Sequence, residues 1–233
     1  HFVHNLTDEH GKKRFLGMIC EGADHLLGYR SPNYVYRPPH TGDGPHGKPF
    51  GLLLKNYRLS DDIAFRFSNR GWKEWPLSAE KFAGWVNQIN GDGFCCNLFM
   101  DYETFGEHQW ADTGIFEFLD ALPGAVYDTN HGHNDFLTPS QLLDCYEPVG
   151  EYDVKDWISW ADSERDLSAW LGNPIQDGAA AELYALEGPV KERHKAGDPY
   201  ILEDWRKLTT SDHLYYMRSE EHTSELQSPY VIS

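Results

Sequence analysis

Two continuously apolar runs constrain the fold of this chain most, and an acidic residue follows each of them. The first run covers residues 15–20 and precedes Glu21, and the second begins near Phe94 and closes at residues 97–100 before Asp101. Runs of this kind are typical of strands that are buried on both faces, as in a parallel sheet. In α/β barrels and open α/β sheets the chemistry is placed at the carboxyl ends of the strands. The sequence therefore predicts an α/β fold with Glu21 and Asp101 at the functional edge of its sheet.

A third strand is predicted over residues 50–54, and the segments between the strands have helical patterns. Capping side chains predict helices over residues 61–67 after Ser60, from Ser78 onward, and over residues 114–121 after Thr113. From Thr138 onward the pattern is helical throughout. The predicted helices there begin at Thr138 and cover residues 163–171, 179–194 and 199–209.

Composition and charge narrow the classes of protein. The 233 residues carry 20 Lys+Arg against 37 Asp+Glu, which gives a formal net charge of −17, and 40% of them are hydrophobic. This composition supports a buried core and excludes a disordered or collagen-like chain, and the charge argues against nucleic-acid or anionic-membrane partners. No apolar run approaches the roughly 20 residues that a membrane span needs. We therefore expect a soluble, cytoplasmic protein.

Two residue patterns favour a metal or cofactor site, but each lacks a feature that such a site needs. His131, His133 and Asp135 are of metal-ligating types, so a zinc hydrolase is a rival interpretation, although no third His or Cys stands at a supporting spacing. Residues 42–47 match a Gly-rich dinucleotide pattern, yet they follow prolines rather than a strand. The four cysteines have no metal-binding spacing and are expected to be reduced. No metal and no cofactor are expected.

The segment of residues 97–110 combines acids with aromatic and histidine side chains. Asp101 closes the second apolar run, Glu103 can lie on the same side of an extended turn, and His108 and Trp110 follow. Two neighbouring carboxylates shift each other's pKa values apart, which allows one of them to act as an acid near neutral pH. Aromatic rings beside carboxylates suit sugars, whose C–H faces stack on rings while the hydroxyls bond acids. A structural ion network is the alternative interpretation.

The stretch Asp101-Tyr-Glu-Thr-Phe-Gly-Glu-His resembles the fourth conserved region of glycoside hydrolase family 57, in particular its α-amylase branch. That region has a D-x-E-x-F-G pattern whose Asp is the general acid/base. Four more stretches resemble amylase-branch sequence, and the resemblance extends over residues 1–217. These stretches are residues 20–34, 59–68, 160–172 and 211–217.

The resemblance implies an incomplete (β/α)7 TIM-like barrel followed by a helical region. Residues 1–137 would be the C-terminal part of the barrel and residues 138–217 the helical region that completes the active site. The implied activity is hydrolysis of α-1,4-glucans such as starch, glycogen and maltodextrin, with retention of configuration. The expected partner is therefore the glucan substrate, with no nucleic acid and no membrane.

The resemblance also assigns roles to single residues. Asp101 would be the general acid/base, and Glu103 an orienting acid. His108 stands where some relatives carry Trp, which favours the amylase branch over the transferases. In the region that resembles the fifth conserved region, Trp170 would border the sugar site and Asp166 precedes it, although Trp170 as a helix core residue is the alternative.

The family's nucleophile is a Glu on an earlier strand, which we expect upstream of His1. Glu21 is the substitute at a strand end, although it matches a later segment of the family. The chain is then a fragment that carries the acid/base without the nucleophile and is expected to be inactive alone. Residues 218–233 resemble translated sequencing adapter and are expected to be a non-native tail. The alternatives are a 4-α-glucanotransferase and an amylase-like glucan-binding protein without catalysis.

Overall fold

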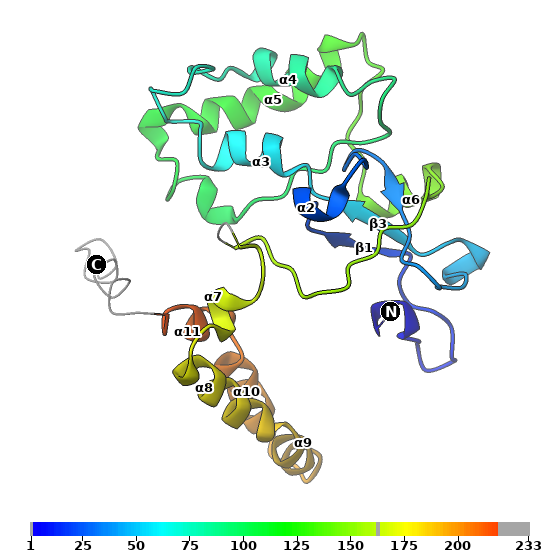
Figure 1. Ribbon diagram of the computed structural model, residues 1–233, viewed down its shortest axis with the longest axis vertical. Helices are drawn as coiled ribbons and strands as arrows, with labels where there is room; N and C mark the ends of the chain where they lie inside the picture. The colour runs from blue at the N-terminus through cyan, green and yellow to red at the C-terminus, as the bar shows by residue number, and fades with distance from the viewer. Residues whose placement is uncertain (1, 162–163, 219–233) are drawn as a thin grey trace. The chain divides into compact units, whose positions relative to one another are not determined.

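A three-stranded sheet organises the first of the two units into which the chain divides (Figure 1). The computed structural model describes residues 2–161 and 164–218, and the two units are His1–Lys155 and Asp156–Ser233. Strand β3 (Gly51–Leu54) lies between β1 (Gly17–Cys20) and β2 (Val35–Tyr36). Strands β1 and β3 are parallel, with Gly17 opposite Gly51, and β2 is antiparallel to β3. The predicted strands over residues 15–20 and 50–54 and the mixed α/β class are confirmed.

Of the two parallel strands β1 and β3, β3 is buried on both faces, although two buried faces were predicted for residues 15–20 and 97–100. Its side chains alternate, so Leu52 and Leu54 pack into one hydrophobic cluster and Leu53 into another. In β1, by contrast, Met18 and Ile19 are 40% and 49% exposed. The prediction of two buried faces is therefore wrong for β1, because Met18 and Ile19 point to opposite faces of the sheet and both remain partly exposed.

Helix α6 (Pro139–Cys145) packs onto the sheet at two glycines that are register partners. A Cβ at Gly51 would overlap the methyl groups of Leu143, which lies on α6. A Cβ at Gly17 would overlap both Leu143 and the backbone carbonyl of Gly51. Glycine at these positions thus lets the helix approach the sheet closely. The helix begins at Thr138, whose side chain forms the predicted cap with Gln141.

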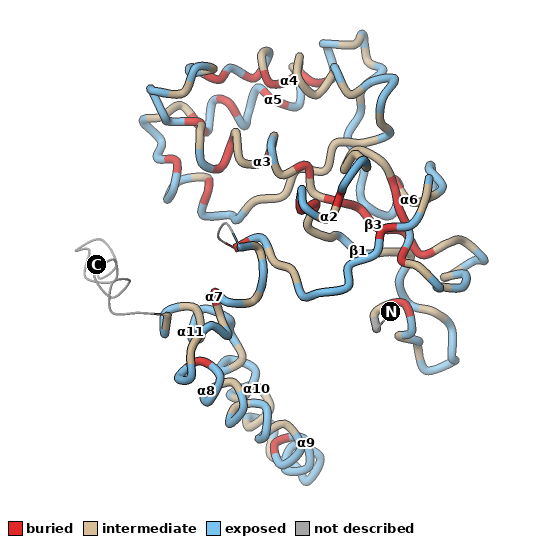
Figure 2. The backbone as a smooth tube through the Cα atoms, viewed as in Figure 1, coloured by how far each residue is buried: buried red, intermediate tan, exposed pale blue. Residues whose placement is uncertain are grey.

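Three helices of the first unit share a core of their own. They are α3 (Tyr57–Ala64), α4 (Ala79–Asn87) and α5 (Ile115–Thr129), and α4 and α5 run side by side in Figure 1. Phe82 and Ile115 are fully buried in this core, and Figure 2 shows buried stretches on both α4 and α5. Leu98 and Met100 pack against this cluster from the segment that leads to Asp101. The helical core thereby supports the segment on which the candidate site lies.

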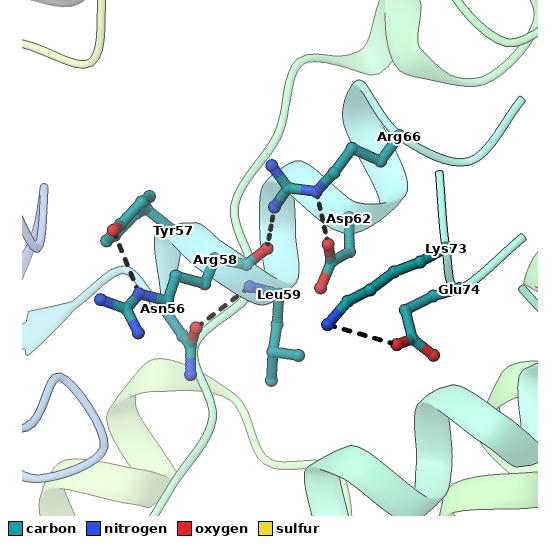
Figure 3. A network of polar contacts seen from close by, with 8 residues as sticks. All are labelled: Asn56, Tyr57, Arg58, Leu59, Asp62, Arg66, Lys73 and Glu74. Carbon is teal, nitrogen blue, oxygen red and sulfur yellow. Dashed lines mark hydrogen bonds and ion pairs between the residues drawn. The ribbon is translucent and has the colours of Figure 1, made fainter. Parts of the chain in front are cut away.

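Helix α3 begins four residues before the predicted start. Asn56, not Ser60, is its cap, because the Asn56 side chain accepts a hydrogen bond from Leu59 N at 3.2 Å (Figure 3). Ser60 is buried inside the helix instead, where its hydroxyl donates to the Asn56 carbonyl and accepts from Phe99 N. On the outer side of α3, Arg66 Nε donates to Asp62 at 2.6 Å. Helix α3 therefore begins one turn closer to the end of β3 than the sequence pattern predicts.

Two further helix predictions need correction. Thr113 does not cap α5; its hydroxyl donates to the Trp110 carbonyl, and Gly114, in the left-handed conformation, precedes the helix. The helix predicted over residues 179–194 is two helices, α8 (Pro174–Ala185) and α9 (Glu187–Lys195). Pro189 has no N–H to donate to the Ala185 carbonyl, so the ladder of helical hydrogen bonds is interrupted where the two helices meet. The helix after Ser78 is confirmed, with Ser78 as its cap.

The predicted strand that ends at residues 97–100 is not formed. Its N–H groups bond to scattered acceptors: Phe94 N and Cys95 N share the Asn33 carbonyl, and Phe99 N bonds the Ser60 hydroxyl. A strand requires a regular ladder with one neighbour, and these contacts are to unrelated points. The segment still lies beside the carboxyl end of β3 at its start. There the Asn97 side chain donates to the Leu54 carbonyl, and the Asn97 carbonyl accepts from Asn56 N.

The second unit is helical from Ser168 onward, but the described residues between Cys145 and Ser168 form no helix, so the prediction of helices throughout the chain beyond residue 138 is confirmed only in part. Gln176 is fully buried there, and its side-chain amide donates to the carbonyls of Ala169 and Leu214 while its oxygen accepts from Gly172 N. Residues 162 and 163 and residues 219–233 lie outside the described residues, and the helix predicted over residues 163–171 is observed only from Ser168. The remaining helices are α1 (Phe2–Asn5), α2 (Asp24–Leu27), α7 (Ser168–Leu171), α10 (Ile201–Leu208) and α11 (Ser211–Tyr215). None of the helices in the described part of the chain is long and apolar enough to cross a membrane.

The contact at α6 yields a prediction about stability. Gly51→Ala should lower the free energy of unfolding by about 1–3 kcal/mol, because the new methyl group displaces Leu143. Adding Leu143→Ala should recover part of that loss, since the overlapping atoms belong to a side chain. In the matched variant Gly17→Ala, Leu143→Ala should give little recovery, because the overlap with the Gly51 carbonyl persists. Urea unfolding of the parent, the three single variants and the two double variants measures both couplings, and equal couplings in the two pairs would contradict the packing described here.

Candidate active site

The carboxyl ends of the two parallel strands carry a nearly buried ion pair. Glu21 follows β1 and Lys55 follows β3, and Lys55 Nζ lies 3.7 Å from Glu21 Oε2. The Lys55 side chain is 14% exposed and the Glu21 side chain is 9% exposed. Lys55 N also donates to the Cys20 carbonyl, which extends the pairing of the strands by one residue. Sequence reasoning missed Lys55, although a charged residue directly after the apolar run of residues 50–54 was the same signal that pointed to Glu21.

The segment of residues 97–100, which leads to Asp101, starts at the same edge. Asn56 N donates to the Asn97 carbonyl at 2.8 Å, and the Asn97 side chain donates to the Leu54 carbonyl at 3.0 Å. Leu54 is the last residue of β3, so these bonds fix the start of the segment at the carboxyl end of that strand. Four residues later, Asp101 is exposed at the start of a short 3₁₀ turn.

A compact loop follows Asp101 and is anchored by two buried polar residues. Thr104 and Gln109 are 1% and 3% exposed, and Gln109 Nε2 donates to the Ala64 carbonyl at 2.9 Å. Ala64 ends α3, so this bond satisfies a carbonyl that the helix itself leaves open. Inside the loop, His108 N donates to the Glu103 carbonyl and Gln109 N to the Thr104 carbonyl. These bonds hold the loop against the helical core.

The residues proposed for chemistry lie on the outer side of this loop. Asp101, Glu103 and His108 are exposed, and Trp110 is 58% exposed. The structure therefore brings these four predicted residues together on one anchored loop. Solvent-facing carboxylates beside an imidazole and an indole can exchange protons with a ligand and stack on its apolar face.

Asp166 and Trp170 lie in the second unit, which is described by itself. Two hydrogen bonds to Ser168, from its hydroxyl and its backbone N–H, lower the pKa of Asp166, which keeps this carboxyl ionised at neutral pH. The Trp170 ring packs edge-on against Trp160 at 5.8 Å between ring centroids and tilted against Tyr215 at 6.2 Å. Trp170 is only partly buried in this aromatic cluster, so the ring serves packing and keeps an accessible part.

The rival zinc interpretation has no geometric support where the structure describes the chain. No group of three or more His, Cys, Asp or Glu side chains within residues 2–161 and 164–218 is arranged to hold a metal ion. All four cysteines are free thiols. Burial raises the pKa of Cys20 and Cys95 to about 11 and that of Cys96 to about 12, which keeps these thiols protonated.

Comparison with known proteins identifies the class to which this fold and site belong. The model of glycosyl hydrolase family 57 matches residues 6–155, which include the whole Asp101 loop. A curated protein of Methanocaldococcus jannaschii, named "Putative alpha-amylase", is 44% identical over 211 residues, which cover 87% of this chain and 42% of that protein. No solved structure matches the chain significantly.

The chain belongs to glycosyl hydrolase family 57, because the family model covers well over half of it. The predicted family and its α-amylase branch are confirmed. The chain spans 42% of the length of the curated relative.

The thiols provide a chemical check on the burial described here. Cys145 is exposed, whereas burial suppresses the thiolate of Cys20, Cys95 and Cys96. At pH 7.5, a thiol with a pKa of about 11 has about 300-fold less reactive thiolate than one with the ordinary pKa of about 8.5. Titration of the native chain with a thiol reagent at pH 7.5 should show one fast equivalent, which Cys145→Ser removes. Two or more fast equivalents would contradict the burial of the other three.

Proposed function

We propose that this chain is the part of a retaining α-glucan hydrolase of the α-amylase type that carries the general acid/base, Asp101. The substrates would be α-1,4-glucans such as starch, glycogen and maltodextrin. One observation carries the proposal: Asp101 is exposed on an anchored loop that begins beside the carboxyl end of β3, inside the region matched by the family model. Membership of the family and a relative named as an amylase support this substrate class.

In the proposed mechanism, Asp101 moves one proton in each of two steps. In the first step its carboxyl donates a proton to the glycosidic oxygen while a second carboxylate attacks the anomeric carbon, so the C–O bond breaks as a glycosyl ester forms. In the second step the Asp101 carboxylate takes a proton from water, which displaces the ester and restores both groups. Retention requires the two carboxyl groups to be about 5–5.5 Å apart.

We propose that the attacking carboxylate comes from a Glu outside this chain. The environment of Glu21 supports this assignment, because its side chain is nearly buried and is paired with Lys55. A nucleophile must reach the anomeric carbon, whereas a carboxylate held by a lysine between two strands is suited to stabilise the edge of the sheet. In this proposal Glu21 and Lys55 hold the ends of β1 and β3 in register.

We also propose that the sheet is part of an incomplete (β/α)7 barrel. Residues 1–137 would form the C-terminal part of this barrel, residues 138–217 the helical region that completes the site, and residues 218–233 a non-native tail. The parallel pairing of β1 and β3 and the half-exposed apolar side chains of β1 support the barrel. The proposed boundary after residue 137 falls at the start of α6, inside the first unit.

The other proposed site residues would contact the sugar rather than react with it. Glu103 and His108 would bond hydroxyl groups next to the scissile bond, and Trp110 would stack on a sugar face. Trp170 would supply a second aromatic surface, and Asp166 would orient the turn that leads to it. The hydrogen bonds of Asp166 to Ser168 at the start of α7 support that orienting role.

The role of Asp101 can be tested in a complete enzyme. In a chimera, residues 1–217 of this chain replace the aligned segment of the M. jannaschii relative. Asp101→Asn in this chimera should lower kcat/KM on soluble starch by about 10²–10⁴-fold, because the variant cannot protonate the leaving oxygen. An aryl maltoside with an acidic phenol as leaving group needs little protonation, so its first step should be much less affected.

The matched control is Asp120→Asn on the exposed face of α5, which should leave kcat/KM within twofold. Activity of the Asp101→Asn chimera within threefold of the parent would refute the proposal. Products longer than the substrate would identify a transferase instead, and glucan binding without any turnover would identify a binding protein.

A second prediction concerns Trp170 in the same chimera. Trp170→Ala should weaken maltodextrin binding by about 0.5–1.5 kcal/mol, since a ring that contacts the sugar is lost. The control is Trp157→Ala, whose ring is 81% exposed in the same unit and should not affect affinity. Affinity and thermal unfolding are measured together. A lower melting temperature with unchanged affinity per folded molecule would show that Trp170 serves only the contacts with Trp160 and Tyr215.

A further inference from the structure

A cavity of about 370 Å³ lies in the first unit and shares no residue with the Asp101 loop. Its walls come from the loop between β1 and β2, from β2 itself, from Asp92 and from residues 149–151. The loop leaves the carboxyl end of β1 and returns beside that of β3, so the cavity lies at the carboxyl edge of the sheet. Cavities of this size are in the range of small-ligand sites.

The walls of this cavity are held in place by backbone and side-chain bonds. Residues 149–152 run along β2, where Val149 N donates to the Val35 carbonyl and Arg37 N to the Gly150 carbonyl. An ion pair of 3.2 Å between Arg37 and Glu151 closes this side. On the other side, the Tyr36 hydroxyl donates to the Ser31 carbonyl at 2.8 Å. The cavity is therefore formed before any ligand enters, which reduces the entropy cost of binding.

The lining combines three tyrosines with charged hydrogen-bonding groups. Tyr29, Tyr34 and Tyr36 line the cavity together with Arg30 and Asp92. The Tyr29 ring is 92% exposed, and the Arg30 guanidinium lies 4.9 Å from the ring centroid. Arg30 is itself fixed, because its Nε donates to the Glu151 carbonyl at 2.9 Å. One aromatic platform is thus presented to solvent and backed by a positioned cation.

This chemistry fits a neutral sugar better than an ionic ligand. The C–H faces of a pyranose stack on phenol rings, while its hydroxyls both donate to carboxylates and accept from a guanidinium. Glu151 is paired with Arg37, and Asp92 offsets the charge of Arg30, so an anionic ligand such as a phosphate gains no net attraction. We propose that this cavity is a subsite for a stretch of α-glucan outside the catalytic loop, with Tyr29 as its stacking platform. The identity of the sugar rests on the proposed function.

The test uses the 233-residue chain itself with maltoheptaose as the probe, measured by isothermal titration calorimetry. Tyr29→Ala should weaken binding about three- to tenfold through the loss of the stacked ring. Tyr29→Phe keeps the ring and should bind within twofold of the parent chain. Tyr200→Ala removes a tyrosine that is 71% exposed in the second unit and should change nothing. Asp92→Ala provides a second, independent loss of about threefold or more by removing a hydrogen-bond acceptor.

The outcomes separate this subsite from the proposed catalysis. Binding that depends on Tyr29 and Asp92 but is unchanged in Asp120→Asn supports the subsite, even if the chimera fails to hydrolyse starch. Unchanged binding in both Tyr29→Ala and Asp92→Ala overturns it. Absence of maltoheptaose binding to the parent chain also overturns it, even if the chimera is an active hydrolase. Equal binding of cellohexaose, a β-1,4-glucan, would overturn the assignment to α-glucans.

Discussion

The hydrogen-bonding demand of a fully buried strand governs the first unit. Both faces of β3 are covered, so water cannot satisfy its N–H and C=O groups, and each must find a partner in the protein. Strand β1 provides partners on one edge and β2 on the other, and the Asn97 side chain bonds the last carbonyl, that of Leu54. The same requirement that stabilises the strand thus brings together the loop after β1, the start of α3 and the segment that leads to Asp101.

The residues available for chemistry lie on loops whose fixed points are buried polar groups. Gln109 and Thr104 hold the Asp101 loop to the end of α3, so the exposed acids project from a segment that cannot move freely. The tyrosine-lined cavity follows the same rule, since backbone bonds to β2 and the contact of Arg30 with Glu151 fix its walls. In the second unit Gln176 has this role, as it ties three helical segments together from a fully buried position. Rigid anchors beneath exposed residues hold the side chains of a binding or catalytic site in a fixed geometry.

The sequence predicts elements well where a local pattern has one solution, and poorly where the solution depends on a distant partner. The caps at Ser78 and Thr138 were predicted because a hydroxyl bonds an N–H three residues away in the same segment. Ser60 has the same local pattern, but its hydroxyl is used inside the helix for Asn56 and Phe99, which no local pattern reveals. The run that ends at residues 97–100 has the composition of a strand, yet no neighbouring strand runs along it among the described residues. Its N–H groups bond instead to Asn33 and Ser60.

The sequence by itself determined the family, the α/β class, the strands over residues 15–20 and 50–54 and the candidate acid Asp101. Each of these follows from residues that are contiguous along the chain, namely apolar runs and the acids and aromatic residues after them. Only the tertiary structure decided that Glu21 pairs with Lys55, that two glycines let α6 approach the sheet, and that Tyr29, Arg30 and Asp92 line one cavity with Glu151. These contacts join residues that are 30 to more than 100 positions apart. Their geometry is set by how buried groups satisfy one another across the core, and a linear pattern does not contain that information.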